Sequence, residues 1–192
     1  EAIRLVRLPQ TLPQALNDED VHRVVLNTKH PQDGLTIALM YESGIRIKEL
    51  CDLKVGDIDF DSIHIRGKGE IDRIVYITDK LANKIQDFIH RHEKYSDMYL
   101  FCNVVCGNDG WGEKLTTNTA RLRIQKAFKK EGVDMHPHQL RHTFAINLLQ
   151  AGCDIVTIQN LLGHKYITTT QTYLRVSNNY LRGEYKKYIK SA

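Results

Sequence analysis

A single change of hydrophobic period most constrains the fold of this 192-residue chain. Residues 59–78, DFDSIHIRGKGEIDRIVYIT, alternate apolar and polar side chains on both sides of a Gly-Lys-Gly turn, which predicts a β-hairpin. In the other patterned stretches, apolar residues recur every three to four positions, as in amphipathic helices. The sequence therefore predicts a mainly α fold with one small antiparallel sheet, of the α+β class.

Helices are predicted over most of the remaining chain from period and end signals. Asn17 and Thr78 are placed to cap two of these helices, and Gly44 to end a third. The predicted helical ranges are 17–28, 32–43, a short helix around 47–53, 78–94, 118–131, 138–151, 154–162 and, with a break near 176–178, 168–190. Residues 1–16 show no period and are predicted to be a linker or N-terminal extension.

Composition is that of an ordinary globular protein, with 42% hydrophobic and 26% charged residues. No apolar run approaches the ~18 residues of a membrane span, and no signal peptide is recognisable. We therefore expect a cytoplasmic protein. The net charge of +4 permits a nucleic-acid partner without requiring one.

The cysteines follow no disulfide-scaffold spacing, so reduced thiols are the preferred interpretation. Cys102 and Cys106 lie four positions apart, and His90, His92 and His136 are possible neighbours in the fold. A zinc site is therefore kept as an alternative, although this spacing alone is a weak signal.

The helix predicted over 138–151 carries a charge on its apolar side. Arg141 falls on the stripe of Leu140 and Phe144, and His138 flanks that stripe. A buried charge requires a partner. The start of a helix favours an anion, and a guanidinium fits two phosphate oxygens. A bound phosphate and a buried carboxylate are both possible partners.

Other polar residues follow turns in the predicted fold. Arg46 comes shortly after a helix-ending glycine, with Glu49 three positions further on. Lys68 lies between two glycines at the hairpin tip, where a lysine can reach into a groove and donate a proton. His164 follows another helix-ending glycine, and Tyr173 lies in a Thr-rich stretch nine positions later. Taken singly, each is more typical of surface charge or packing than of chemistry.

Taken together, these segments resemble a known family. SGIRIKELCDL, RGKGEIDRIVYI, HPHQLRHTFAINLLQAGCDIVTIQNLLGH and TTTQTYLRVS are similar, in this order and spacing, to the catalytic domain of tyrosine site-specific recombinases. This family includes phage integrases and Xer-type recombinases, and the Xer type looks closest. The resemblance covers about residues 10–177.

The resemblance implies a role for each matched residue. Arg46 and Arg141 would hold the scissile phosphate, and Tyr173 would attack it. Lys68 would protonate the leaving 5′ oxygen, and His138 would accept a proton. The other matched residues are His164, which would hydrogen-bond a non-bridging oxygen, and Glu49, which would support the site without reacting.

The implied reaction cleaves and rejoins DNA through a 3′-phosphotyrosine without metal, cofactor or ATP. The implied partner is double-stranded DNA, with a tetramer on paired sites and a monomer or weak oligomer without DNA. Residues 17–177 would be the catalytic domain and residues 178–192 a tail helix, packed in cis or on a neighbour. Residues 1–16 would lead from an N-terminal DNA-clamping domain that this chain does not include.

Several alternatives stay open. The biological role is either Xer-type chromosome dimer resolution or integration and excision of a mobile element. A topoisomerase and a catalytically inactive DNA-binding regulator are two further hypotheses. Other tyrosines compete for the role of nucleophile, namely Tyr166, Tyr180, Tyr185 and Tyr188, but Tyr173 alone has the Thr-rich setting of the family.

Overall fold

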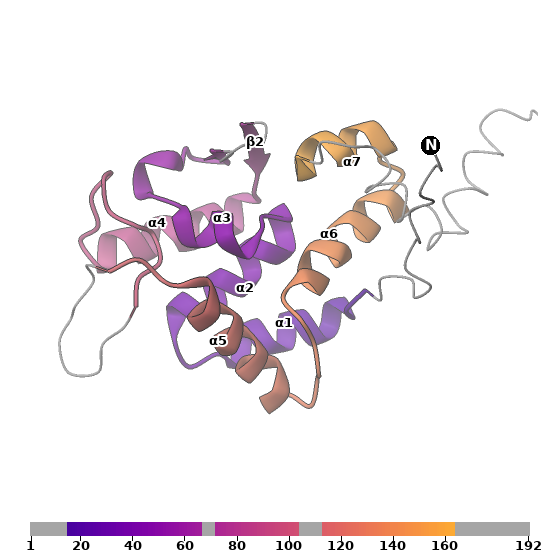
Figure 1. The fold of residues 1–192 in the computed structure, drawn as a ribbon, viewed down its shortest axis with the longest axis horizontal. Coiled ribbons are helices and arrows are strands. Elements are labelled where there is room, and N and C mark those ends of the chain that lie inside the picture. Colours follow the sequence, from indigo (N-terminus) through magenta and orange to yellow (C-terminus); the bar gives the residue numbers. More distant parts are fainter. Residues whose placement is uncertain (1–14, 67–71, 104–112, 164–192) are drawn as a thin grey trace, which may run out of the picture.

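The computed structural model describes residues 15–66, 72–103 and 113–163. The chain is mainly helical, with one small sheet, as the sequence predicts (Figure 1). The elements in chain order are α1 (Asp18–Asn27), α2 (Pro31–Ser43), α3 (Ile47–Asp52), the 3-10 turn η1 (Val55–Asp57), β1 (Ser62–Ile65), β2 (Arg73–Tyr76), α4 (Asp79–Arg91), α5 (Thr117–Lys130), α6 (His138–Gln150) and α7 (Ile155–Leu162).

The predicted hairpin is confirmed. β1 and β2 pair antiparallel, with Ser62 opposite Tyr76 and Ile65 opposite Arg73. Side chains alternate between the two faces of the sheet, so that Val75 is buried while its neighbours in the strand are exposed. The strands are shorter than residues 59–78 would allow. The tip, with Lys68, lies outside the described residues.

The predicted helix ends are largely confirmed, because they depend on local hydrogen bonds. The side chains of Asn17 and Thr78 accept bonds from the backbone N–H groups of the first turns of α1 and α4. Gly44 ends α2 with a φ of 63°, in the left-handed region. α4, predicted to reach Lys94, ends three residues earlier at Arg91, because Glu93 adopts a φ of 47°.

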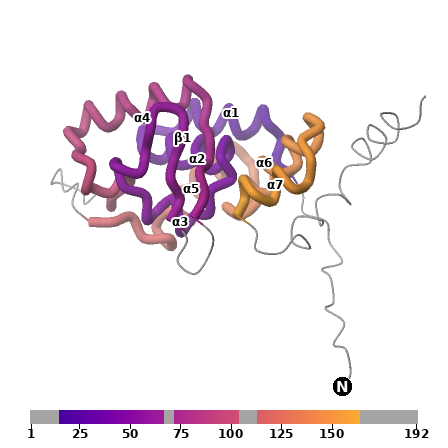
Figure 2. Tube along the Cα trace, turned by 90° about the horizontal axis from the view of Figure 1, so that it is seen from above, coloured from indigo at the N-terminus to yellow at the C-terminus, as the bar shows by residue number. Residues whose placement is uncertain are grey.

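α2 lies at the centre of the fold and packs against α1, α4, α5 and α6. Leu35, Ile37, Leu39 and Met40 on this helix are all buried, as expected for a helix surrounded by others. α6 and α7 lie on the side of the molecule opposite α4 in both views (Figure 1; Figure 2).

A separate, smaller apolar cluster joins α7 to α6. Its buried members are Ala145, Ile146, Leu149, Ile158 and Leu162. Of the α7 residues only Ile158 and Leu162 are buried, so polar contacts at the C-terminal end of this helix add to its placement.

The described chain begins with residues that pack on α6. Leu16 is buried, and its backbone N–H donates to Thr143 Oγ1 at 2.9 Å. Residues 1–14 of the predicted linker lie outside the described residues. None of the described helices is long and apolar enough to cross a membrane.

Core packing on α5 provides a test of the fold. Phe128 is fully buried, so we expect Phe128→Ala to lower the free energy of unfolding by about 3–5 kcal/mol through lost burial and a cavity. Leu122, on the same helix, is 52% exposed, and Leu122→Ala should change the free energy of unfolding by only about 0.5 kcal/mol. Urea unfolding of both variants makes the comparison, and similar losses would show that α5 is packed differently.

Candidate active site

Arg141 is buried, as its place on the apolar stripe predicts. It lies in the first turn of α6, and the residue is 4% exposed. Its Nη1 donates to the Gly44 carbonyl at 2.6 Å, and its Nη2 donates to the Leu162 carbonyl at 2.7 Å. These two carbonyls lie at the C-terminal ends of α2 and α7, where helices carry partial negative charge. Backbone carbonyls are thus partners that sequence reasoning had not considered.

Arg46 lies at the start of α3 and is tied to that helix by Glu49. The Arg46 backbone N–H donates to Glu49 Oε2 at 2.8 Å, and Arg46 Nη1 donates to Glu49 Oε1 at 2.9 Å. A carboxylate at the third helical position is well placed to accept from the backbone N–H of the residue that caps the helix. The side chain of Arg46 is therefore oriented by its own helix.

Arg73 of β2 joins the site and was missed by the sequence reasoning. Its side chain is 5% exposed, and Nη1 and Nη2 donate to Glu49 Oε1 and Oε2, both at 2.8 Å. Its Nε donates to the Leu161 carbonyl at 2.9 Å. The strand alternation could have revealed it, because Arg73 lies two positions before Val75 and so shares the buried face of the strand. Arg141 was recognised in the corresponding way, as a charge on the apolar face of a helix.

Glu49 is a permanent anion at neutral pH. Burial alone would raise the pKa of this carboxyl, but hydrogen bonds and charge from Arg73, and then from Arg46, lower the pKa to about 2. A carboxylate with this pKa is ionised near pH 7 and is a weak proton acceptor. Glu49 contacts Arg46 and Arg73, and the supporting role that the family resemblance implies for it remains a prediction.

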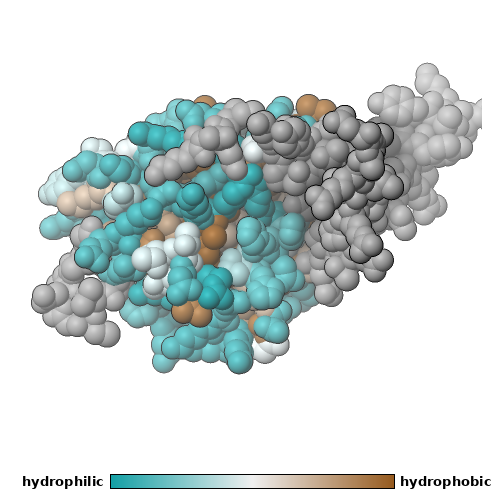
Figure 3. All heavy atoms as spheres, in the orientation of Figure 1, coloured by the Kyte–Doolittle hydropathy of each residue, from teal (hydrophilic) through white to brown (hydrophobic). Residues whose placement is uncertain are grey.

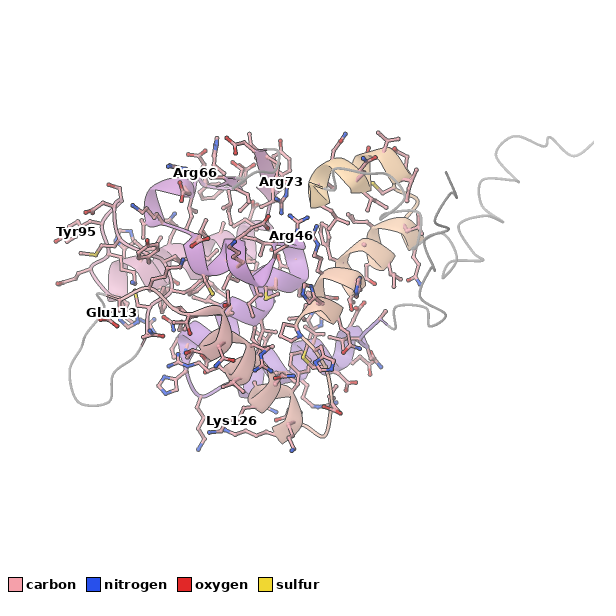
Figure 4. The ribbon with its side chains drawn as sticks, viewed as in Figure 1. Arg46, Arg66, Arg73, Tyr95, Glu113 and Lys126 are labelled. Carbon is pink, nitrogen blue, oxygen red and sulfur yellow. The ribbon has the colours of Figure 1, made fainter. Side chains whose placement is uncertain are left out.

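Arginines from different elements meet at the C-terminal end of α7. The carbonyls of Leu161, Leu162 and Gly163 accept bonds from Arg73, Arg141 and Arg46 at 2.9, 2.7 and 3.5 Å, respectively. Figure 4 shows Arg46 and Arg73 in the region between β2, the start of α3 and the end of α7. The structure thus brings Arg46 and Glu49 to the same place as Arg141, which lies far from them in the sequence.

Two histidines lie beside Arg141 on α6. His138, the first residue of the helix, is exposed and lies one turn before Arg141. His142 is half-buried, and burial, followed by the charges of His138 and Arg141, lowers its pKa. The neutral form of His142 is therefore favoured near pH 7. His138 is the more accessible of the two for proton transfer.

The remaining predicted site residues lie outside the described part of the chain. These are Lys68, His164 and Tyr173. Lys68 belongs to the hairpin tip between β1 and β2, and His164 directly follows Gly163, the residue that ends α7. Their roles remain predictions.

The described cysteines are free thiols. Burial raises the pKa of Cys51 to about 11, which disfavours the reactive thiolate. The sulfur of buried Cys102 lies 3.3 Å from Lys94 Nζ. Among the described residues no group of three or more His, Cys, Asp or Glu side chains could hold a metal, and Cys106 is outside that set.

The sequence of the chain matches that of the phage integrase family over residues 14–179, and the chain belongs to this family. Two relatives are tyrosine recombinases XerA. The one from Pyrococcus horikoshii is 35% identical over 97% of this chain and 65% of the relative, and the one from Thermococcus kodakarensis is 37% identical over 97% and 67%. The chain thus spans just under two thirds of the Pyrococcus protein.

A solved structure agrees with this assignment. The crystal structure of a XerA recombinase superposes with a TM-score of 0.79 and 29% identity, covering 96% of this chain and 68% of the other. Its fold is that of the tyrosine recombinase catalytic domain, which confirms the predicted fold class.

The low pKa of Glu49 has a measurable consequence. Its folded-state pKa of about 2 lies below the ordinary value of 4.5, so its stabilisation is complete above pH 4.5 and is lost as the pH falls towards 2. We expect the stability advantage of wild type over Glu49→Gln to shrink by about 3 kcal/mol across this window. Urea unfolding at several pH values measures it.

A direct titration separates Glu49 from the other carboxyls. The side-chain ¹³C shift of Glu49 should show a midpoint near pH 2 in the wild type and a higher midpoint in Arg73→Met. A wild-type midpoint at or above 4.5 would contradict the assigned ion pair.

Proposed function

We propose that this chain is the catalytic domain of a site-specific DNA recombinase that cleaves and rejoins strands through a 3′-phosphotyrosine. The observation that carries the proposal is the meeting of Arg46 and Arg141 at the end of α7, directly before the segment that contains His164 and Tyr173. Relatives named as tyrosine recombinases, 35–37% identical over nearly the whole chain, support it.

In the proposed cleavage step, the Tyr173 hydroxyl oxygen attacks the scissile phosphorus. The bond from phosphorus to the 5′ oxygen breaks, and a bond from phosphorus to the tyrosine oxygen forms. His138 accepts the tyrosine proton, and Lys68 donates a proton to the leaving 5′ oxygen. The phosphodiester is thereby exchanged rather than hydrolysed. A 5′-hydroxyl of another strand reverses these steps to rejoin DNA.

The two arginines of the motif suit the charge that this step creates. Attack places additional negative charge on the non-bridging oxygens, and fixed guanidinium groups stabilise that charge without reorganising. Arg46 and Arg141 are already held by Glu49 and by helix-end carbonyls before any phosphate arrives. His164 would add a hydrogen bond to the same oxygens.

The proposed partner is double-stranded DNA. A XerH site-specific recombinase bound to difH substrate has the same fold, with a TM-score of 0.76 at 24% identity. The described residues on the face seen in Figure 3 are largely hydrophilic. Arg66, which directly follows β1, has a side chain that is 78% exposed. A polar surface with exposed cationic side chains suits a phosphate backbone.

The proposal extends to assembly and biology. Residues 17–177 form the catalytic domain, and the protein pairs sites as a tetramer on DNA while remaining a monomer or weak oligomer without it. Residues 178–192 lie outside the described residues, and the tail helix predicted there, packed in cis or on a neighbour, is part of the proposal. Xer-type chromosome dimer resolution is favoured, because the relatives named above are XerA proteins. Integration or excision of a mobile element is the second candidate, and a recombination site with flanking repeats beside the gene would favour it.

Trapping of the covalent intermediate tests the proposed chemistry. The full-length gene product is incubated with nicked duplexes of its own flanking DNA, whose 5′ fragment diffuses away after cleavage. We expect a protein–DNA band on a denaturing gel for wild type and for Tyr180→Phe, and none for Tyr173→Phe. A band that survives in Tyr173→Phe would move the nucleophile elsewhere. No band from the wild type would favour an inactive DNA-binding protein.

Substitution of a phosphate-binding arginine tests the charge argument. We expect Arg46→Gln to reduce the single-turnover cleavage rate by about 10²–10³-fold, the usual cost of losing one donor to a developing oxyanion. Arg23→Gln is the matched control, because Arg23 of α1 pairs with Asp20 and Glu131, away from the site. Equal effects of the two substitutions would remove Arg46 from the reaction.

A further inference from the structure

We propose that Arg73 is a positioning residue for strand cleavage, an inference that rests on the function proposed above. Arg73 has no part in the roles carried over from the family, yet its side chain is more deeply buried than that of Arg46, 5% against 25% exposed. Through Glu49, Arg73 fixes the orientation of the Arg46 side chain. Through its contacts with the end of α7, it fixes the point from which the chain leads to His164 and Tyr173.

The first contact is a shared carboxylate. Glu49 Oε1 accepts from Arg73 Nη1 and from Arg46 Nη1, and Glu49 Oε2 accepts from Arg73 Nη2 and from the Arg46 backbone. The two parallel bonds from Arg73 fix the plane of the carboxylate. The direction of the bond to Arg46 Nη1 is therefore fixed as well. Without Arg73, the carboxylate could rotate and Arg46 would have a less defined orientation.

The second contact is with the end of α7. Arg73 Nε donates to the Leu161 carbonyl, and a Cβ atom added at Gly163 would lie 2.9 Å from Arg73 Cδ and 3.0 Å from its Nη1. The side chain of Arg73 thus lies directly against the residue that precedes His164. One guanidinium contacts both the support of Arg46 and the point at which the chain leaves α7.

The ion pair of Arg73 and Glu49 acts on geometry as well as on stability. Desolvation offsets much of the Coulomb attraction of a buried ion pair, but loss of one partner alone is destabilising, because the other charge is left buried and unpaired. The bonds of such a pair also restrict the positions of the groups they join. A substitution of Arg73 should therefore change the rate of cleavage more than the binding of DNA.

The test is a double-substitution cycle on the full-length gene product with nicked duplex DNA. The single-turnover cleavage rate at saturating DNA and the Kd for DNA are measured for wild type, Arg73→Met, Glu49→Gln and the double variant. We expect Arg73→Met to slow cleavage by about 10–100-fold, as for supporting residues around other reactive centres, with Kd little changed. In the Glu49→Gln background, Arg73→Met should slow cleavage by a much smaller factor, because the two residues act together.

Each outcome bears on the inference separately from the proposed function. Wild-type cleavage by Arg73→Met, or an equal loss in both backgrounds, would overturn it. If Arg73→Met fails to fold in thermal melts, Arg73→Lys decides. That variant keeps the charge and loses the fork, so its cleavage should be slowed with Kd unchanged, and wild-type cleavage would again overturn the inference. Absence of a covalent product from the wild type would instead refute the proposed function.

The contact with α7 has a matched pair of glycines. Gly163 and Gly132 both have positive φ, 65° and 77°, so alanine strains the backbone at either position. A Cβ at Gly132 meets nothing within 4 Å, whereas at Gly163 it meets Arg73. We expect Gly163→Ala to slow cleavage more than Gly132→Ala does. In the Arg73→Met background, Gly163→Ala should slow cleavage by a smaller factor than in the wild type. Equal factors in the two backgrounds would overturn this half of the inference.

Discussion

The hydrogen bonds between arginine side chains and the last carbonyls of α7 are the interaction on which the site depends. A helix leaves its final carbonyls unpaired and carries partial negative charge at that end. Arg46, Arg73 and Arg141 donate to the carbonyls of Gly163, Leu161 and Leu162. Because α7 has only a small apolar contact with α6, these bonds do much to place it. The same bonds gather side chains from α3, β2 and α6 into one cationic centre.

Glu49 makes this concentration of positive charge possible. Guanidinium groups repel one another, and burial strengthens that repulsion by excluding water. One carboxylate that accepts from both Arg46 and Arg73 offsets part of the repulsion, and their influence lowers its pKa to about 2. A positive surplus remains in the cluster. In the proposed reaction that surplus stabilises a phosphoryl group as it gains negative charge.

The features that could be predicted from sequence depend on local structure, and the missed ones depend on tertiary contacts. The hairpin, the caps Asn17 and Thr78, and the glycine end of α2 each have a signal within a few residues. The burial of Arg141 was readable from helical period, but its partners are backbone carbonyls, which any residue carries. Arg73 was readable in the same way from the alternation of β2. Its pairing with Glu49 was not, because it joins a strand to a helix across the fold. The early end of α4 was missed because Glu93, rather than a glycine, takes the positive φ.

The position of the site at the end of α7 links phosphate binding to the chain that follows. Gly163 turns the chain in the left-handed region while its carbonyl accepts from Arg46, and a Cβ atom added at this glycine would meet Arg73. In the proposed complex, a phosphate would accept hydrogen bonds from the guanidinium groups of Arg46 and Arg141, which also donate to the last carbonyls of α7. If phosphate binding strengthens or weakens the bonds to α7, those bonds change the affinity for phosphate by the same factor, since a coupling free energy is reciprocal. In the proposed function, the arginines that bind the phosphate therefore also help to place α7, the helix that directly precedes His164 in the sequence.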